Sequence, residues 1–124
     1  QQSIRMPGYV QNPLKYFRNA DVFVLSSRLE GLPNVLIEAM LCGCTSVATD
    51  CPTGPREVLA DGKYGYLVPV DDCTAMAAAI AKAIDSPIAP ELLSEAVKPF
   101  AEDPVIDRHF KILGLNDFSM ELKE

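Results

Sequence analysis

Two carboxylates separated by seven residues mark the stretch of this sequence where chemistry is most readily expected. Glu30 opens and Glu38 closes the sequence EGLPNVLIE at residues 30–38. Glu38 has apolar neighbours on every side of an expected helix, and such a helix is normally buried. A buried carboxylate costs on the order of several kcal/mol unless it is hydrogen-bonded or paired. Glu38 therefore needs a partner, either donor groups such as the ribose hydroxyls of a nucleotide or a Lys or Arg elsewhere in the fold.

The turn between the two glutamates suits an anion. Asn34 is the expected cap of the following helix, whose unpaired N–H groups and positive dipole end would favour a diphosphate. Gly31 lets the backbone approach a ligand closely, and Pro33 stiffens the entry into the helix. Glu30 would then lie beside the phosphate, where it could accept hydrogen bonds from sugar hydroxyls or stabilise positive charge at an anomeric carbon. Taken singly, these are ordinary turn and loop residues, and only their spacing makes a site.

Alternating β and α segments must position this stretch. Residues 22–25, VFVL, form an apolar run without polar alternation, which predicts a strand buried on both faces of a parallel sheet. The other expected strands are residues 4–10, 45–49 and 66–68, and the expected helices are residues 14–19, 34–42, 55–59, 73–84, 91–98 and 106–113. Asn12 and Asp71–Asp72 are the expected caps of the helices at 14–19 and 73–84, and Gly43 should end the helix at 34–42. Cys42 and Cys44 are expected to serve as small packing residues. This alternation predicts an α/β fold, a Rossmann-like open parallel sheet with helices on both faces. Ligands bind such sheets beyond the carboxyl ends of the strands, where loops 26–33 and 50–54 should lie.

Composition and charge narrow the class of protein. With 124 residues, 48% of them hydrophobic and 23% charged, the chain reads as one globular domain, with an expected core over residues 1–86 and a helical segment over 87–124. The net charge of -6 gives no reason to expect nucleic-acid binding, and no apolar run approaches the roughly 20 residues of a membrane span. The four cysteines do not match a paired zinc pattern, so we expect no metal site and a reducing, cytoplasmic compartment.

The order of residues around the two glutamates resembles a known family. The stretch EGLPNVLIEAM matches the E-x7-E signature of retaining glycosyltransferases of the GT-B fold, which has two Rossmann-like domains, and is most similar to family 4. The matching frame runs over roughly residues 8–85 and includes Gly8, Tyr9, Val10, Tyr16, Ala20, Asp21, Val22, Phe23, Val24, Ser26, Gly43, Thr49, Asp50, Gly54, Glu57 and Gly65. A lone E-x7-E would be a weak signal, whereas this ordered set is specific.

The resemblance implies roles for individual residues. Glu30 is the catalytic candidate that contacts hydroxyls of the donor sugar, and Glu38 holds the ribose of the nucleotide. The remaining donor-binding candidates are the backbone contacts to sugar and phosphates, at Gly31, Leu32, Pro33, Asn34 and Val35, and the base pocket, at Tyr9 and Val10. The implied reaction transfers a hexosyl group from a nucleotide-diphosphate sugar to a glycan or lipid-linked acceptor, with retention of configuration and with neither metal nor cofactor.

The resemblance also implies that this chain is one part of a larger enzyme. Family members carry an acceptor domain upstream, and the opening strands of their donor domain bring a glycine-rich loop, an Arg and a Lys to the diphosphate. These features are not found in the 124 residues. We therefore expect an incomplete C-terminal donor-binding half that is inactive alone, in an enzyme of the cytoplasm or the inner membrane face. The alternatives are a non-catalytic nucleotide-sugar-binding module and a sugar-nucleotide epimerase of the same fold.

Overall fold

Three parallel strands form the centre of the molecule, which a computed structural model describes over residues 4–100, 104–112 and 114. They lie in the order β1 (Val22–Leu25), β2 (Thr45–Thr49) and β3 (Tyr66–Val68). In the register of the sheet, Val47 of β2 pairs with Val24 on one side and with Tyr66 on the other. The α/β class and the Rossmann-like parallel sheet are thus confirmed, and so are the bounds of these three strands.

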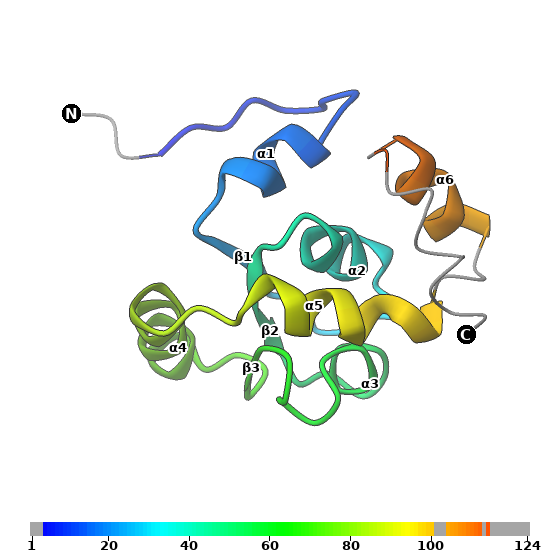
Figure 1. The fold of residues 1–124 in the computed structure, drawn as a ribbon. Coiled ribbons are helices and arrows are strands. Elements are labelled where there is room, and N and C mark those ends of the chain that lie inside the picture. The colour runs from blue at the N-terminus through cyan, green and yellow to red at the C-terminus, as the bar shows by residue number, and fades with distance from the viewer. Residues whose placement is uncertain (1–3, 101–103, 113, 115–124) are drawn as a thin grey trace.

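Helices cover both faces of this sheet (Figure 1). Helices α2, α3 and α5 lie on one side of the sheet, whereas α4 lies on the other. The helices are α1 (Leu14–Asn19), α2 (Asn34–Leu41), α3 (Pro55–Val58), α4 (Cys73–Asp85), α5 (Pro90–Val97), the 3-10 helix η1 (Lys98–Phe100) and α6 (Pro104–Ile112). Their bounds agree with the expected ones to within about two residues, apart from the expected end at residue 113, which lies outside the described residues. No described helix combines the length and the apolar character that crossing a membrane requires.

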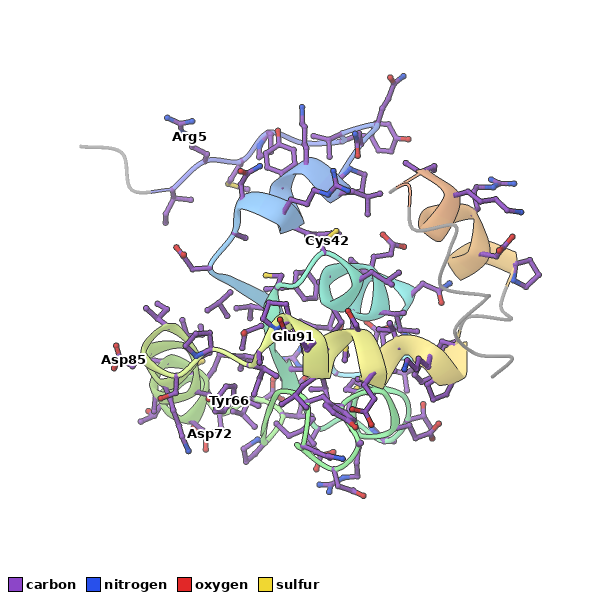
Figure 2. The ribbon with its side chains drawn as sticks, in the orientation of Figure 1. Arg5, Cys42, Tyr66, Asp72, Asp85 and Glu91 are labelled. Carbon is purple, nitrogen blue, oxygen red and sulfur yellow. The ribbon has the colours of Figure 1, made fainter. Side chains whose placement is uncertain are left out.

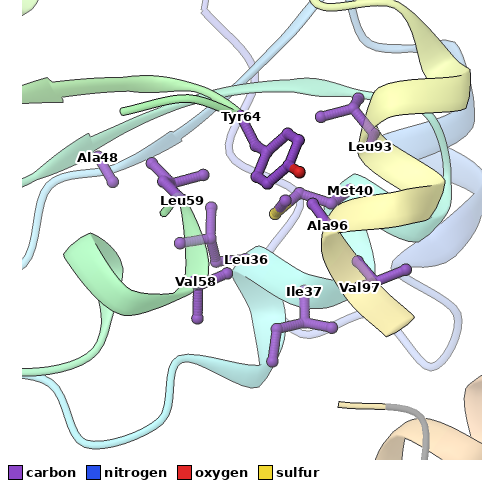
Figure 3. Close-up of a cluster of buried hydrophobic side chains, with 10 residues drawn as sticks. All are labelled: Leu36, Ile37, Met40, Ala48, Val58, Leu59, Tyr64, Leu93, Ala96 and Val97. Carbon is purple, nitrogen blue, oxygen red and sulfur yellow. The ribbon is translucent and has the colours of Figure 1, made fainter. Parts of the chain in front are cut away.

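The larger part of the core lies between α2, α3 and α5 (Figure 3). Its fully buried members include Leu36 and Ile37 from α2 and Leu93 and Val97 from α5. A smaller cluster of Val47, Val68 and Ala83 lies under α4 on the opposite face of the sheet. Because α5 supplies side chains to the main cluster, the packed core extends beyond residue 86.

The strand expected at residues 4–10 is not formed. These residues have no regular secondary structure, and the side chain of Tyr9 is 92% exposed. A strand is stable only when its N–H and C=O groups pair with a neighbour. The sheet of the described residues places no strand beside this segment, so its apolar residues have nothing to pair with.

The expected burial of β1, residues 22–25, on both faces is also wrong, and β2 is the strand that is buried in this way. All five residues of β2 are buried, whereas β1 is partly exposed and Val24 is 38% exposed. The reason is position, because β2 is the central strand and β1 lies at the edge of the sheet. An apolar run predicts a strand without indicating how many neighbours cover it.

The helix caps follow local chemistry closely. Asp72 caps α4 as expected, since its side chain accepts a hydrogen bond of 2.8 Å from the amide of Ala75. The cap of α1 is Pro13 instead of the expected Asn12, and its carbonyl oxygen accepts from the amide of Tyr16 at 2.9 Å. Gly43 follows the end of α2, as expected for a helix terminator, and its amide donates to Met40.

Candidate functional site

The two loops that leave β1 and β2 meet at the carboxyl edge of the sheet. The hydroxyl of Thr53 in loop 50–54 donates to the carbonyl oxygen of Glu30 in loop 26–33. The hydroxyl of Thr49, at the end of β2, donates to the carbonyl oxygen of Ser27 in loop 26–33 at 2.5 Å. The expectation that both loops share one edge is therefore confirmed, and the two threonines hold them together.

Gly54 brings the backbones of the two loops into direct contact. Its φ of +98° is unfavourable for residues with a Cβ. A Cβ at this position would overlap the carbonyl oxygen of Gly31 and lie 2.7 Å from the Cδ atom of Pro33. Only a glycine allows loop 50–54 to pack this tightly beneath the turn at residues 31–33.

Glu30 is half-buried beside this contact, and its carboxylate has a local partner. One carboxylate oxygen accepts a hydrogen bond of 2.6 Å from the hydroxyl of Ser27, and the backbone carbonyl accepts from Thr53. Both the side chain and the backbone of Glu30 are thus held by neighbouring residues. A carboxylate fixed in this way is ready to accept a further hydrogen bond from a bound hydroxyl without a new ordering cost.

The turn after Glu30 is open on its outer side. A Cβ at Gly31 would have no atom within 4 Å, and Leu32 is exposed. Pro33 is buried and forms the N-terminal boundary of α2. Residues 31 and 32 therefore leave room for a ligand to reach the backbone, which is the property predicted for Gly31.

Asn34 does not cap α2, contrary to the sequence-based expectation. Pro33 is the capping residue, no side chain caps the helix, and Asn34 is its first residue. The amides of Leu36 and Ile37 donate to the carbonyl oxygen of Pro33, at 2.9 and 3.4 Å, and that of Asn34 donates to Leu32. This hydrogen-bonded turn leaves fewer unpaired amides for an anion than expected. The Oδ1 atom of Asn34 is buried and has no hydrogen-bond partner among the described residues.

Helix α2 is not buried on all sides, so the expectation that Glu38 is a buried carboxylate is wrong. Leu36, Ile37, Ala39 and Met40 are buried, whereas Glu38 is only half-buried. The half-buried residues recur at the helical spacing of three and four and form a single stripe of Asn34, Val35, Glu38, Leu41 and Cys42. Glu38 lies on this partly accessible stripe with Asn34 and Val35, so its carboxylate is only partly removed from water.

Two thiols, Cys42 and Cys44, lie between α2 and β2, and Figure 2 shows that Cys42 faces α1. The sulfur of Cys42 lies 3.9 Å from the carbonyl oxygen of Leu14, and that of Cys44 lies 3.6 Å from that of Ala20. Burial raises the pKa of the Cys42 thiol. The positive charge of Arg18 lowers this pKa, and the carboxylate of Glu38 raises it further. Burial, with a contribution from Cys42, raises the pKa of Cys44 to about 11. Both thiols remain protonated near neutral pH and serve packing, as expected.

Tyr9 and Val10 lie apart from this arrangement. The segment that carries them runs past α1, on the side of that helix away from the sheet (Figure 1). Tyr9 is almost fully exposed and Val10 is half-buried. The structure thus brings residues 30–38 together with loop 50–54, but it does not build the walls of a base pocket around Tyr9.

Three residues support the site although the sequence did not predict that role, and two of them, Thr49 and Gly54, appeared only as members of the family frame. Thr49, Thr53 and Gly54 hold loop 26–33 in place, although none was a candidate for binding. The signal was present in the adjacent Thr and Gly of loop 50–54, because a glycine beside a hydroxyl residue at a carboxyl edge favours close backbone approach.

Arg56 fixes the same loop from the other side. Its guanidinium pairs with both oxygens of Asp50, at the start of loop 50–54, and with Asp61 at 3.1 Å. The hydrogen bonds from Arg56 hold the pKa of the Asp50 carboxyl below its usual range. By contrast, Arg28 forms an exposed ion pair of 2.8 Å with Asp71, which contributes little to stability.

A cavity of about 290 Å³ lies at the same edge of the sheet, against α4. It is lined by Ser26, Thr49, Pro69, Asp71, Asp72, Cys73, Met76, Ala77 and Ile80. Glu30 and Glu38 are not among its lining residues. It is mostly apolar and is separate from the turn that carries the carboxylates.

The Rossmann-like sheet thus places Glu30 and the open turn at Gly31 beyond the carboxyl ends of its strands, where open parallel sheets bind their ligands. The sequence matches the family described as glycosyl transferases group 1 over residues 1–86. The chain therefore belongs to the group 1 glycosyl transferases, which confirms the class of enzyme that the resemblance implied.

Three relatives show the range of this family. The chain is 38% identical over 76 residues to N-acetylgalactosamine-N,N'-diacetylbacillosaminyl-diphospho-undecaprenol 4-alpha-N-acetylgalactosaminyltransferase of Campylobacter jejuni, covering 61% of the chain and 21% of the relative. It is 44% identical over 82 residues to a phosphatidyl-myo-inositol mannosyltransferase of Mycolicibacterium smegmatis, covering 62% and 20%. It is 36% identical over 110 residues to a putative colanic acid biosynthesis glycosyltransferase of Salmonella typhimurium, covering 81% and 27%. The chain thus spans less than a third of the length of each.

Proposed function

We propose that this chain is the donor-binding part of a retaining family 4 glycosyltransferase of the GT-B fold. The observation that carries the proposal is the braced, open turn at residues 30–33, which leads into the accessible stripe of α2. Glu30 is held by Ser27, the outer side of Gly31 is open, and Glu38 lies on the stripe that begins at Asn34. These features offer a nucleotide-diphosphate sugar carboxylates for its hydroxyls and backbone for its phosphates.

The proposed roles follow the order of the groups along the donor. The carboxylate of Glu30 accepts hydrogen bonds from the sugar hydroxyls and stabilises positive charge as the diphosphate departs. The positive end of α2 and the backbone of residues 31–35 bind the phosphates, and Glu38 accepts from the ribose hydroxyls. Tyr9 and Val10 are proposed to contact the base.

The proposed reaction forms a bond from the anomeric carbon to an acceptor oxygen and breaks the bond from that carbon to the diphosphate. The acceptor approaches the face from which the diphosphate leaves, and its proton passes to the departing phosphate, which gives retention of configuration. We propose that no metal ion takes part. In the part of the chain that the structure describes, no three His, Cys, Asp or Glu residues gather as a metal site would require.

The acceptor is proposed from the relatives. The Campylobacter relative is named for a diphospho-undecaprenol acceptor and the Mycolicibacterium relative for phosphatidyl-myo-inositol. A lipid-linked or glycan acceptor is thus the class that we propose for the whole enzyme, bound by its other domain. The reaction would take place in the cytoplasm, at the inner face of the membrane.

Replacement of Glu38 by Gln in the full-length protein tests the donor site. The substitution keeps the size of the side chain but weakens the acceptor for the ribose hydroxyls, and hydrogen bonds to charged groups contribute about 1.5–3 kcal/mol. We expect the KM for the donor to rise about tenfold or more, measured as release of UDP or GDP from a panel of UDP- and GDP-hexoses. Glu57→Gln is the matched control, because Glu57 is an exposed carboxylate on α3.

The outcomes separate the proposed activity from its alternatives. Unchanged donor kinetics in Glu38→Gln would remove the role assigned to this residue. Donor binding without any transfer in the wild-type protein would indicate a non-catalytic module instead. An epimerised sugar in the NMR spectrum, formed without acceptor, would indicate an epimerase.

A further inference from the structure

We infer that Thr53 is a positioning residue for the donor sugar, acting through the backbone of Glu30. This inference rests on the proposed function, because it assigns a purpose to the hydrogen bond between the Thr53 hydroxyl and the carbonyl oxygen of Glu30. That bond joins the loop after β2 to the one residue whose carboxylate is proposed to face the sugar. Thr53 itself does not need to touch the ligand.

The geometry of loop 26–33 explains why one hydroxyl has this influence. The loop is tied down at its beginning, where Thr49 donates to the carbonyl oxygen of Ser27, and at its end, where Pro33 packs against Gly54. Between these points, the hydroxyl of Thr53 donates a hydrogen bond to the backbone of the loop, at the carbonyl oxygen of Glu30. Without that bond, the backbone at residues 28–30 would lose its tie to loop 50–54, whereas Gly31 and Pro33 would stay packed against Gly54.

Loop 50–54 is rigid enough to act as the support. Asp50, at its start, is paired with Arg56, and Arg56 is paired in turn with Asp61 beyond α3. At its end, Gly54 leads directly into α3, where its carbonyl oxygen accepts a hydrogen bond of 3.0 Å from the amide of Val58. A hydroxyl carried by a loop fixed at both ends can define the position of a partner, because the support does not follow the partner when it moves.

The position of Thr53 makes the inference testable without unfolding the protein. Its side chain is exposed and belongs to neither buried cluster. Thr53→Val keeps the shape of the side chain and removes the hydroxyl, and Thr53→Ser keeps the hydroxyl. Glu38 lies on α2, whose core contacts through Leu36, Ile37 and Met40 do not involve Thr53. The ribose and phosphate contacts should therefore survive the loss of this hydroxyl.

The experiment compares the wild-type full-length protein with Thr53→Val and Thr53→Ser. For each, release of UDP or GDP from UDP- and GDP-hexoses gives kcat and KM, calorimetry gives the affinity for UDP and GDP alone, and thermal melting reports folding. We expect Thr53→Val to lower kcat/KM for the donor about fivefold, as for the loss of one ordinary hydrogen bond. The affinity for UDP or GDP and the melting temperature should remain unchanged, and Thr53→Ser should restore kcat/KM.

The possible failures are distinguishable. Equal weakening of nucleotide and nucleotide-sugar binding, or a lower melting temperature in Thr53→Val, would show a merely structural role and overturn the inference. Unchanged donor kinetics in Thr53→Val would overturn it as well. Absence of donor binding and donor cleavage in the wild-type protein would instead refute the proposed function on which the inference rests.

Discussion

At the scale of single residues, two glycines of the site have opposite reasons to be glycine. Gly31 faces open space, so none of the described residues excludes a side chain there. Gly54 combines a positive φ with backbone contact to Gly31 and Pro33, so the protein excludes a side chain at that position. The first glycine leaves room for a ligand, whereas the second holds the two loops together.

Gly54→Ala should destabilise the protein strongly for this reason. The left-handed conformation costs about 1–2 kcal/mol for a residue with a Cβ, and the overlap with Gly31 and Pro33 adds a cost of similar size, about 1–3 kcal/mol. Gly62→Ala is the matched control, since Gly62 has a similar φ of +90° but its Cβ would meet only one atom, at 3.8 Å. Denaturant unfolding should show a loss of about 3 kcal/mol for Gly54→Ala and about 1 kcal/mol for Gly62→Ala. Equal losses would show that loop contact at Gly54 contributes nothing.

The sequence predicted the meeting of the two loops better than the contacts that support it. That meeting follows from strand order and spacing, whereas the role of Glu30 stays a prediction. The supporting contacts of Thr53 and Gly54 are contacts between segments more than 20 residues apart, and they depend on how two loops pack. The expected burial of Glu38 was wrong because one stripe of α2 remains accessible. The expected cap at Asn34 was wrong because the helix begins one residue earlier, with Pro33 as its capping residue.

At the scale of elements, boundaries marked by turn and capping residues in the sequence were the most predictable features. The strand limits of β2 and β3 and the start of α4 at Cys73 match the sequence reading. Residues 4–10 and the exposure of β1 did not match, because both depend on which strands lie alongside. Propensity indicates that a segment favours the extended conformation, but pairing decides whether it becomes a covered strand.

Asp72→Ala tests the cap of α4. The carboxylate of Asp72 accepts a hydrogen bond from the amide of Ala75, and loss of such a cap typically costs about 1 kcal/mol. We expect a decrease of about that size in the free energy of unfolding, measured by denaturant titration. Asp72→Asn is the control, because asparagine caps helices nearly as well and carries no charge. If both variants lose the same stability, charge and not capping explains the effect of Asp72.

At the scale of the whole molecule, the packed core and the family match have different limits. The match to the family model covers residues 1–86, yet Leu93, Ala96 and Val97 of α5 pack with α2 in the main cluster. Helix α2 carries Glu38 and follows directly from the turn with Glu30. Residues beyond the family match thus support the helix on which the proposed donor site depends.

Leu93→Ala should therefore destabilise the protein even though Leu93 lies outside the family match. Leu93 is fully buried against the main cluster, and truncation of such a leucine costs about 2–5 kcal/mol. The adjacent Leu92 is 43% exposed, so Leu92→Ala is a control for helix propensity and composition and should cost well under 1 kcal/mol. Denaturant unfolding of the two variants measures the difference directly. If Leu93→Ala were no more destabilising than Leu92→Ala, α5 would not be part of the core, and the support that it gives to α2 would have to come from elsewhere.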